Sequence, residues 1–171
     1  MEFSENICDK YSNPVYCYIN IIGIKTWSVI SIILLLLLYL LKFNKKILHI
    51  WLCVIILNSI NGFLLLNFLA REKILETFKL TPISLTLIDL LTHVIPLILI
   101  LLYHKIPKLT ILEIIKGITI VGTLFVLYNV IFDIDDIYIS FSIIKLSKYI
   151  VVPLYIILFS LMLIFMNYYL L

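Results

Sequence analysis

One long apolar stretch of the sequence contains two ionisable residues, and this feature most constrains how the chain can fold. Residues 82–103 would form about 33 Å of helix, enough to cross the hydrocarbon of a bilayer. Asp89 and His93 lie inside it on one helical face, which they share with Thr86 and Pro96. Because an ionisable group at membrane depth costs at least about 2.5 kcal/mol, it must face protein or water. We therefore expect this polar stripe to face other helices.

The composition indicates what surrounds the stripe. The 171-residue chain is 64% hydrophobic and 13% charged, whereas soluble domains average about 45–50% and about 25%. This composition predicts an integral membrane protein whose partners are the lipid bilayer and other membrane subunits, including copies of itself. The net charge of +3 is spread over short loops, so we expect no nucleic-acid partner.

The remaining apolar stretches predict four more transmembrane helices. The five expected spans are residues 24–41, 47–70, 82–103, 109–132 and 149–170. No repeat or linker divides them, so we predict one all-α domain, a polytopic membrane helix bundle of five transmembrane helices. Residues 71–79 are predicted to form a mixed-charge loop and residues 137–148 an interfacial segment.

The polar segments predict which side each end of the chain faces. Residues 1–13 are polar and do not begin as a secretory signal would. The lysine-rich turns at 42–46 and 105–108 fall on one side of a five-span bundle, which the positive-inside rule makes cytoplasmic. The amino end is then extracytoplasmic or lumenal and the carboxyl end cytoplasmic. In an oxidising lumen we expect Cys8 and Cys17 to form a disulfide; two unrelated free thiols are the alternative.

Asp89 and His93 are the candidate chemical site. Their i, i+4 spacing lets the carboxylate orient the imidazole, as in a general base or a proton relay. Asn58 and Asn61 in the second span and Asn129 in the fourth are candidate supporting partners, although such residues also serve simply to hold helices together. No second set of ligands accompanies the histidines, so we expect neither a metal nor a cofactor.

Residue usage suggests the kind of genome that encodes the chain. Arg71 is the only arginine and Ala70 the only alanine, while lysine and isoleucine are abundant. This bias is typical of AT-rich genomes, including those of many large DNA viruses, some protists and some low-GC bacteria. It carries no information about chemistry.

The second half of the chain has a characteristic order of features. The run DLLTHVIPLILILLYHKIP (residues 89–107) is followed by a span with Tyr128 and Asn129, an acidic loop with Tyr138 and a last apolar span. Over about residues 85–171 this order resembles the androgen-induced hydrolase family, six-span proteins that cleave lipid esters in the membrane with a threonine and a histidine. The resemblance implies that His93 is the catalytic histidine. It assigns no threonine of this chain as the nucleophile.

Three functions are compatible with these features. The first is a non-catalytic membrane assembly or scaffold protein whose polar stripe holds helices or subunits together. The alternative is an intramembrane lipid-ester hydrolase with His93 as the base and Asp89 as the residue that orients it. The second alternative is a small proton or ion conductor lined by Asp89 and His93. All three functions assign the central role to the same residues, Asp89 and His93, within the bilayer.

Overall fold

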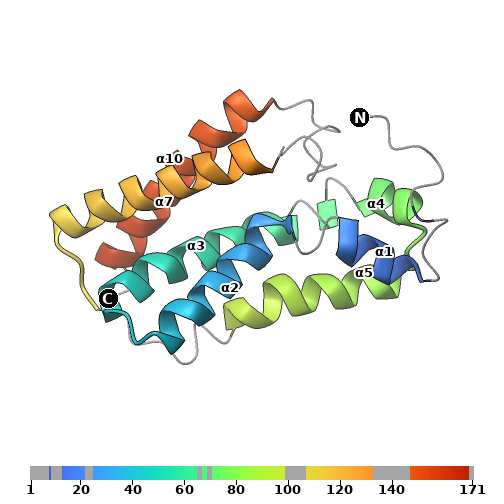
Figure 1. Cartoon of the computed structure of the whole chain (residues 1–171), viewed down its shortest axis with the longest axis horizontal. Coiled ribbons are helices and arrows are strands. Elements are labelled where there is room, and N and C mark those ends of the chain that lie inside the picture. Colours follow the sequence, from blue (N-terminus) through green and yellow to red (C-terminus); the bar gives the residue numbers. More distant parts are fainter. Residues whose placement is uncertain are drawn as a thin grey trace.

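The computed structural model describes residues 8, 13–21, 25–64, 67–68, 71–98, 107–132 and 147–169 (Figure 1). Within these residues the regular elements are helices and there is no strand, which confirms the all-α prediction. In chain order they are α1 (Pro14–Ile21), α2 (Trp27–Leu40), α3 (Lys45–Leu64), α4 (Arg71–Phe78), α5 (Pro82–Asp89), η3 (Leu90–Val94), α7 (Ile111–Ile131) and α10 (Lys148–Tyr169). The π-helical turn η3 continues α5, and the two belong to one helical segment, Pro82–Ile98.

Threonine caps set where α2, α5 and α7 begin. The hydroxyl groups of Thr26, Thr81 and Thr110 each accept a hydrogen bond from the backbone N–H three residues later. The Glu113 carboxylate in turn accepts a hydrogen bond from the backbone N–H of Thr110 and completes a capping box. These side chains satisfy donors that the first turn of a helix leaves without partners. The positions of these threonines therefore explain the starts of the three helices.

The central helix of the bundle is α3. It contacts α2, η3, α7 and α10, and Figure 1 shows these elements running side by side along the long axis. Residues 51–59 of α3 are buried one after another and thus on every side of the helix. A helix buried all round needs apolar residues on all faces. This explains why this part of the sequence is apolar without a clear helical period.

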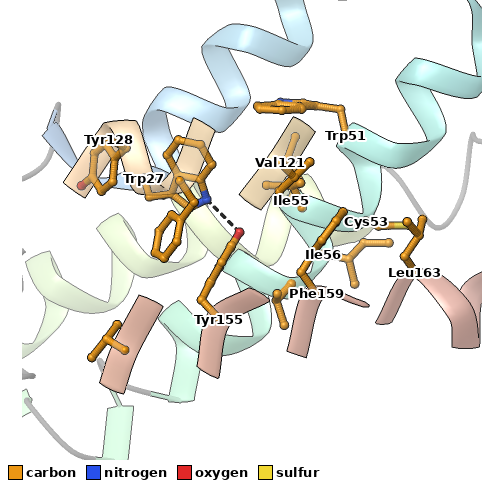
Figure 2. Close-up of a cluster of buried hydrophobic side chains, with 14 of the residues drawn as sticks. Trp27, Trp51, Cys53, Ile55, Ile56, Val121, Tyr128, Tyr155, Phe159 and Leu163 are labelled. Carbon is orange, nitrogen blue, oxygen red and sulfur yellow. Dashed lines mark hydrogen bonds between the residues drawn. The ribbon is translucent and has the colours of Figure 1, made fainter. Parts of the chain in front are cut away.

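An aromatic cluster forms the core between α2, α3, α7 and α10 (Figure 2). Trp27 lies 5.3 Å from Phe125 and 5.1 Å from Tyr128, measured between ring centroids. Phe125 stacks on Tyr155 with 3.9 Å between centroids, and Trp51 completes the cluster from α3. Aromatic side chains bury large areas and add directional ring contacts. The cluster thus fixes how α10 and α7 pack against the first two long helices.

Within the described residues, three helices are long and apolar enough to cross a membrane: α3, α7 and the Tyr149–Tyr168 part of α10. A fourth span is obtained if α4 and Pro82–Ile98, which meet at a bend of 116°, are counted as one broken span. α2 is apolar but has 14 residues, about 21 Å of helix. The structure therefore has three candidate spans, or up to four, where the sequence predicted five. The length and apolar composition of these helices are consistent with an integral membrane protein.

The segment at 71–79 corrects a prediction, because it contains the helix α4 and is not simply a loop. Ile74 and Phe78 lie one turn apart on α4 and are both buried, whereas Glu72, Lys73 and Glu76 are exposed and form its outer face. The described part of the second predicted span is α3, which ends at Leu64, followed by Asn67 and Phe68 in π-helical conformation. The rest of residues 65–70 lies outside the described residues. The acidic loop at 133–136 and most of the predicted interfacial segment lie outside the described residues.

Candidate functional site

The structure brings Asp89 and His93 into direct contact. Asp89 Oδ1 lies 2.8 Å from His93 Nδ1, and the two residues are 4% and 8% exposed. Asp89 is the last residue of α5 and His93 lies in the π-helical turn η3. π-helical turns inside α-helices are often found at functional sites because they widen the helix locally. The i, i+4 spacing in the sequence predicted this pair correctly, but not the π-helical turn.

Thr92 determines which nitrogen of the imidazole carries the proton in its neutral form. The Thr92 hydroxyl donates to the carbonyl of Ile88 over 2.8 Å, and its oxygen lies 3.0 Å from His93 Nδ1. With its proton directed at Ile88, this hydroxyl can only accept from Nδ1, as the Asp89 carboxylate also does. Nδ1 is therefore the donor, and Nε2 carries the free lone pair of the neutral ring.

Asn67 holds the second oxygen of the Asp89 carboxylate. Its amide nitrogen donates to Asp89 Oδ2 over 2.6 Å and to the carbonyl of Phe63 over 2.9 Å. The amide oxygen of Asn67 accepts from Arg71 Nη1 over 3.1 Å. Both carboxylate oxygens of Asp89 thus accept hydrogen bonds, and one amide links this anion to the only arginine of the chain.

The guanidinium group of Arg71 extends the network to the start of α5. Arg71 Nη2 donates to Thr86 Oγ1 over 3.1 Å and to the carbonyl of Pro82 over 3.4 Å. We call the five side chains that are joined in this way the polar cluster: Asn67, Arg71, Thr86, Asp89 and His93. The charges of Arg71 and Asp89 balance, so the cluster is neutral overall when the imidazole is neutral.

Gly62 of α3 lies directly against the imidazole of His93. A Cβ atom at position 62 would overlap the ring atoms Nε2, Cδ2 and Cε1 of His93. The absence of a side chain is what lets the π-helical turn approach the central helix this closely. The polar cluster is therefore bounded on one side by the backbone of α3, and it is exposed at its other end, where Thr86 lies at the surface.

The predicted supporting asparagines do not belong to the polar cluster. Asn58 donates to Ser31 Oγ and accepts from the Tyr155 hydroxyl, over 2.7 and 2.8 Å. Asn129 donates to the carbonyl of Phe125 in its own helix. The side chain of Asn61 makes no hydrogen bond to another described residue. Of the predicted supporting residues only Thr86 joins the cluster, through Arg71.

Sequence reasoning missed Asn67 and Arg71. Both fall near the predicted end of the second span, where a polar residue is easily read as a helix terminus. The available signal was their own i, i+4 spacing, which places an amide and a guanidinium on one helical face close to an intramembrane aspartate. A buried Asp89 requires partners that the predicted second-span asparagines do not supply.

A second buried network joins α2, α3 and α10. Trp27 Nε1 donates to the Tyr155 hydroxyl over 2.7 Å, as the dashed line in Figure 2 shows. The Tyr155 hydroxyl donates to Asn58, and Asn58 donates to Ser31, whose hydroxyl donates to the Trp27 carbonyl. Each member both gives and receives hydrogen bonds, as buried polar groups require. This network explains the role of Asn58 as an interhelical link.

Cys8 and Cys17 form the expected disulfide, with their Cα atoms 5.6 Å apart. Cys53 is a free, buried thiol. In the part of the chain that the structure describes, no group of three or more His, Cys, Asp or Glu residues could hold a metal ion. No serine or threonine hydroxyl there hydrogen-bonds His93 Nε2, and the Thr92 hydroxyl lies on the Nδ1 side. The polar cluster can therefore orient a base, but the described residues do not add a nucleophile to it.

Comparison with known proteins gives no family for this chain. No protein-family model, curated protein or solved structure matches it. The functional argument therefore depends on the geometry of the polar cluster and its surroundings.

Proposed function

We propose that the chain is a non-catalytic integral membrane protein, an assembly or scaffold subunit whose polar cluster holds a bent helical segment in place. The observation that carries this proposal is that the groups of the polar cluster hydrogen-bond one another. Both Asp89 oxygens, the Asn67 amide and the Arg71 guanidinium are bonded to groups of the same chain. A polar network whose members satisfy one another, with the Asp89–His93 bond buried at its centre, fixes the packing of helices.

Five crossings of the membrane are part of the proposal. α2, α3, Pro82–Ile98, α7 and α10 all run along the long axis in Figure 1. Exposed tyrosines lie at both ends of this axis: Tyr39 and Tyr168 at one, Tyr16 and Tyr149 at the other. Tyrosine is enriched where a membrane protein meets the lipid headgroups. Large exposed apolar side chains on the helices between these ends suit contact with lipid.

The same proposal orients the molecule in its membrane. The disulfide of Cys8 and Cys17 requires an oxidising compartment, so its end is extracytoplasmic or lumenal. The opposite end carries Lys42, Lys45, Lys46 and Lys108, which the positive-inside rule makes cytoplasmic. The carboxyl end of α10 then lies in the cytoplasm. Other membrane subunits or further copies of the chain are the partners of such a protein.

A lipid-ester hydrolase is the second candidate, and the tautomer of His93 favours it. Asp89 and Thr92 hold Nδ1, so the general base would be Nε2, the ring nitrogen that lies against Gly62 and that a substrate would reach only if the two helices moved apart. The resemblance to the androgen-induced hydrolase family points to the same histidine. A proton or ion conductor lined by Asp89 and His93 would use the same two groups. Both alternatives need the Asp89 carboxylate, so substitutions of Asp89 can distinguish them from the scaffold function.

The test compares Asp89→Asn with Asp89→Leu. The introduced amide can accept from Asn67 and donate to His93 Nδ1 once the imidazole adopts its other tautomer. The cluster then stays bonded, but Nε2 carries the proton and is no longer a base. Leucine instead removes the carboxylate that both Asn67 and His93 Nδ1 donate to, and the loss of a buried acceptor costs roughly 1–3 kcal/mol.

The scaffold predicts that Asp89→Asn keeps the thermal stability and the mass of the complex extracted from membranes, measured by native mass spectrometry. Asp89→Leu should lose both. In a hydrolase, Asp89→Asn would keep the fold but lose activity by up to on the order of 10⁴-fold, the size seen when a histidine is held in the wrong tautomer. Labelling by an ester-directed covalent probe that disappears in Asp89→Asn or His93→Gln would therefore contradict the scaffold. Proton flux into vesicles that disappears in the same variants would favour a conductor.

A further inference from the structure

Two short helices pack together at the disulfide end of the molecule. α1 and α4 each have 8 residues, and Figure 1 shows them near each other at that end. The rings of Tyr18 and Phe78 meet edge to face with 5.1 Å between centroids, and both side chains are buried. Isolated helices of this length are not stable in water. Each of the two helices therefore depends on its packing against the other.

The disulfide restrains α1 at the point of this contact. Cys17 is adjacent to Tyr18, is fully buried, and is bonded to Cys8, nine residues earlier in the chain. The side chain of Asn13 caps the start of the helix by accepting from the backbone N–H of Val15. Closing such a loop reduces the number of conformations open to the chain when α1 is off its site. The covalent bond thus favours the position of α1 on α4.

α4 in turn carries one member of the polar cluster. Arg71 is its first residue, and its guanidinium bonds Asn67 and Thr86. Ile74 and Phe78, which lie on the buried side of α4, hold this helix in the orientation that directs Arg71 toward the cluster. The ring contact of Tyr18 and Phe78 lies at one end of α4, and Arg71 lies at the other. The helix α4 therefore joins the disulfide side of the molecule to the hydrogen bonds of Arg71, Asn67 and Asp89.

We propose that the Cys8–Cys17 disulfide is a redox-sensitive clasp that holds α1 on α4 and so keeps Arg71 in the polar cluster. Both cysteines are buried, but Cys8 is 8% exposed and Cys17 is 0% exposed. A dithiol on the same side of the membrane would therefore open the bond by attack on the Cys8 sulfur, the less buried of the two. The dithiol supplies two electrons and two protons: its own disulfide forms, the Cys8–Cys17 bond breaks, and two cysteine thiols result. This device goes beyond the assembly role and does not depend on it.

Hydrogen–deuterium exchange tests the clasp on the full chain in lipid nanodiscs, before and after treatment with dithiothreitol. Intact mass confirms that the bond has opened. Amide exchange should become on the order of tenfold faster in α4 and around residues 86–93. α7 and α10, which pack on the far side of α3, should exchange as before. The double variant Cys8→Ser/Cys17→Ser should behave like the reduced chain without any reductant, and Cys53→Ser should behave like the oxidised chain.

Three results would overturn the proposal. Unchanged exchange in α4 after complete reduction would mean that α1 stays in place without its covalent bond. Faster exchange in α4 alone, with residues 86–93 unchanged, would mean that Arg71 does not transmit the change to the cluster. Faster exchange through the whole chain, including α7 and α10, would make the disulfide a global staple and not a local clasp.

Discussion

The imidazole of His93 lies directly against the backbone of Gly62, with no room for a Cβ atom between them. The ring cannot move away freely, because Nδ1 is bonded to Asp89 and lies against the hydroxyl of Thr92. The central helix α3 and the π-helical turn therefore meet where Gly62 contacts His93, whose ring is held by Asp89 and Thr92. This contact makes position 62 a sensitive probe of the polar cluster.

Gly62→Ala is expected to destabilise the protein by about 1–3 kcal/mol, as overpacking of a closely packed site does. The added methyl group forces either the imidazole off Asp89 or α3 away from η3. The free energy of unfolding can be measured in mixed detergent micelles by tryptophan fluorescence, since Trp27 and Trp51 are both buried in the core.

The matched control is Gly122→Ala on α7. A Cβ atom there would lie 3.6 Å from Ile156, at ordinary contact distance. Because alanine is the better helix former, this variant should be neutral or more stable by up to about 1 kcal/mol. Equal losses in the two variants would show that the close approach at position 62 has no special role.

Tyr155→Phe should also destabilise the protein, by about 1–3 kcal/mol. The hydroxyl of Tyr155 accepts from Trp27 and donates to Asn58, so its removal leaves a buried donor and a buried acceptor without this partner. Tyr149→Phe on the same helix is the control, since Tyr149 is 80% exposed. A Tyr155→Phe protein as stable as this control would show that the second network contributes little to stability.

Arg71→Met should loosen the bent segment between α4 and α5. The variant loses the bonds to Asn67 and Thr86, and it leaves the buried Asp89 without its balancing charge. The bond to Asn67 is part-buried and the bond to Thr86 is exposed, so we expect a loss of about 1–2 kcal/mol, the size of hydrogen bonds from a charged donor. Lys73→Met removes the same charge from an exposed position on the same helix and should stay within about 0.5 kcal/mol. Similar unfolding free energies for both variants would show that Arg71 contributes no more to stability than an exposed surface charge.

Apolar stretches and local spacing made part of this fold predictable. Four of the predicted spans contain α2, α7, Pro82–Ile98 and nearly all of α10, and the other overlaps most of α3. The Asp89–His93 contact followed from an i, i+4 spacing, and the Cys8–Cys17 bond from two nearby cysteines at an end expected to face an oxidising lumen. Each of these features depends on residues close together in the chain, which is why a single sequence can reveal it.

The features that depend on tertiary contacts were not predictable in this way. α4 is rich in charge and is helical because Ile74 and Phe78 pack inward. The π-helical turn shows no signal in a window that is apolar almost throughout. From the sequence, Asn67 is typical of a helix end, whereas in the fold it hydrogen-bonds Asp89. In each case the deciding partner lies on another segment, so the local pattern favoured a loop, a regular helix or a terminus.

The last prediction concerns Pro82–Ile98, which either crosses the membrane or re-enters on the same side after the bend of 116°. The segment would be about 26 Å long at 1.5 Å per residue, close to the thickness of the hydrocarbon core. We expect a crossing, because this segment runs beside α3 in Figure 1 and ends near the lysine-rich end of the bundle. Single cysteines at the exposed positions Glu76 and Lys108 flank it and can be labelled from each side of sealed vesicles.

Glu76→Cys should react with a membrane-impermeant maleimide from the extracytoplasmic side, and Lys108→Cys only from the cytoplasmic side. The parent chain is the blank, because Cys53 is fully buried and the other two cysteines are bonded to each other. Lys25→Cys and Lys45→Cys apply the same test to α2, which has 14 residues and falls short of a standard span. Labelling of Glu76→Cys and Lys108→Cys from one side would make Pro82–Ile98 a re-entrant segment. The polar cluster would then belong to a re-entrant segment that does not reach the opposite leaflet. The five-crossing arrangement would be wrong.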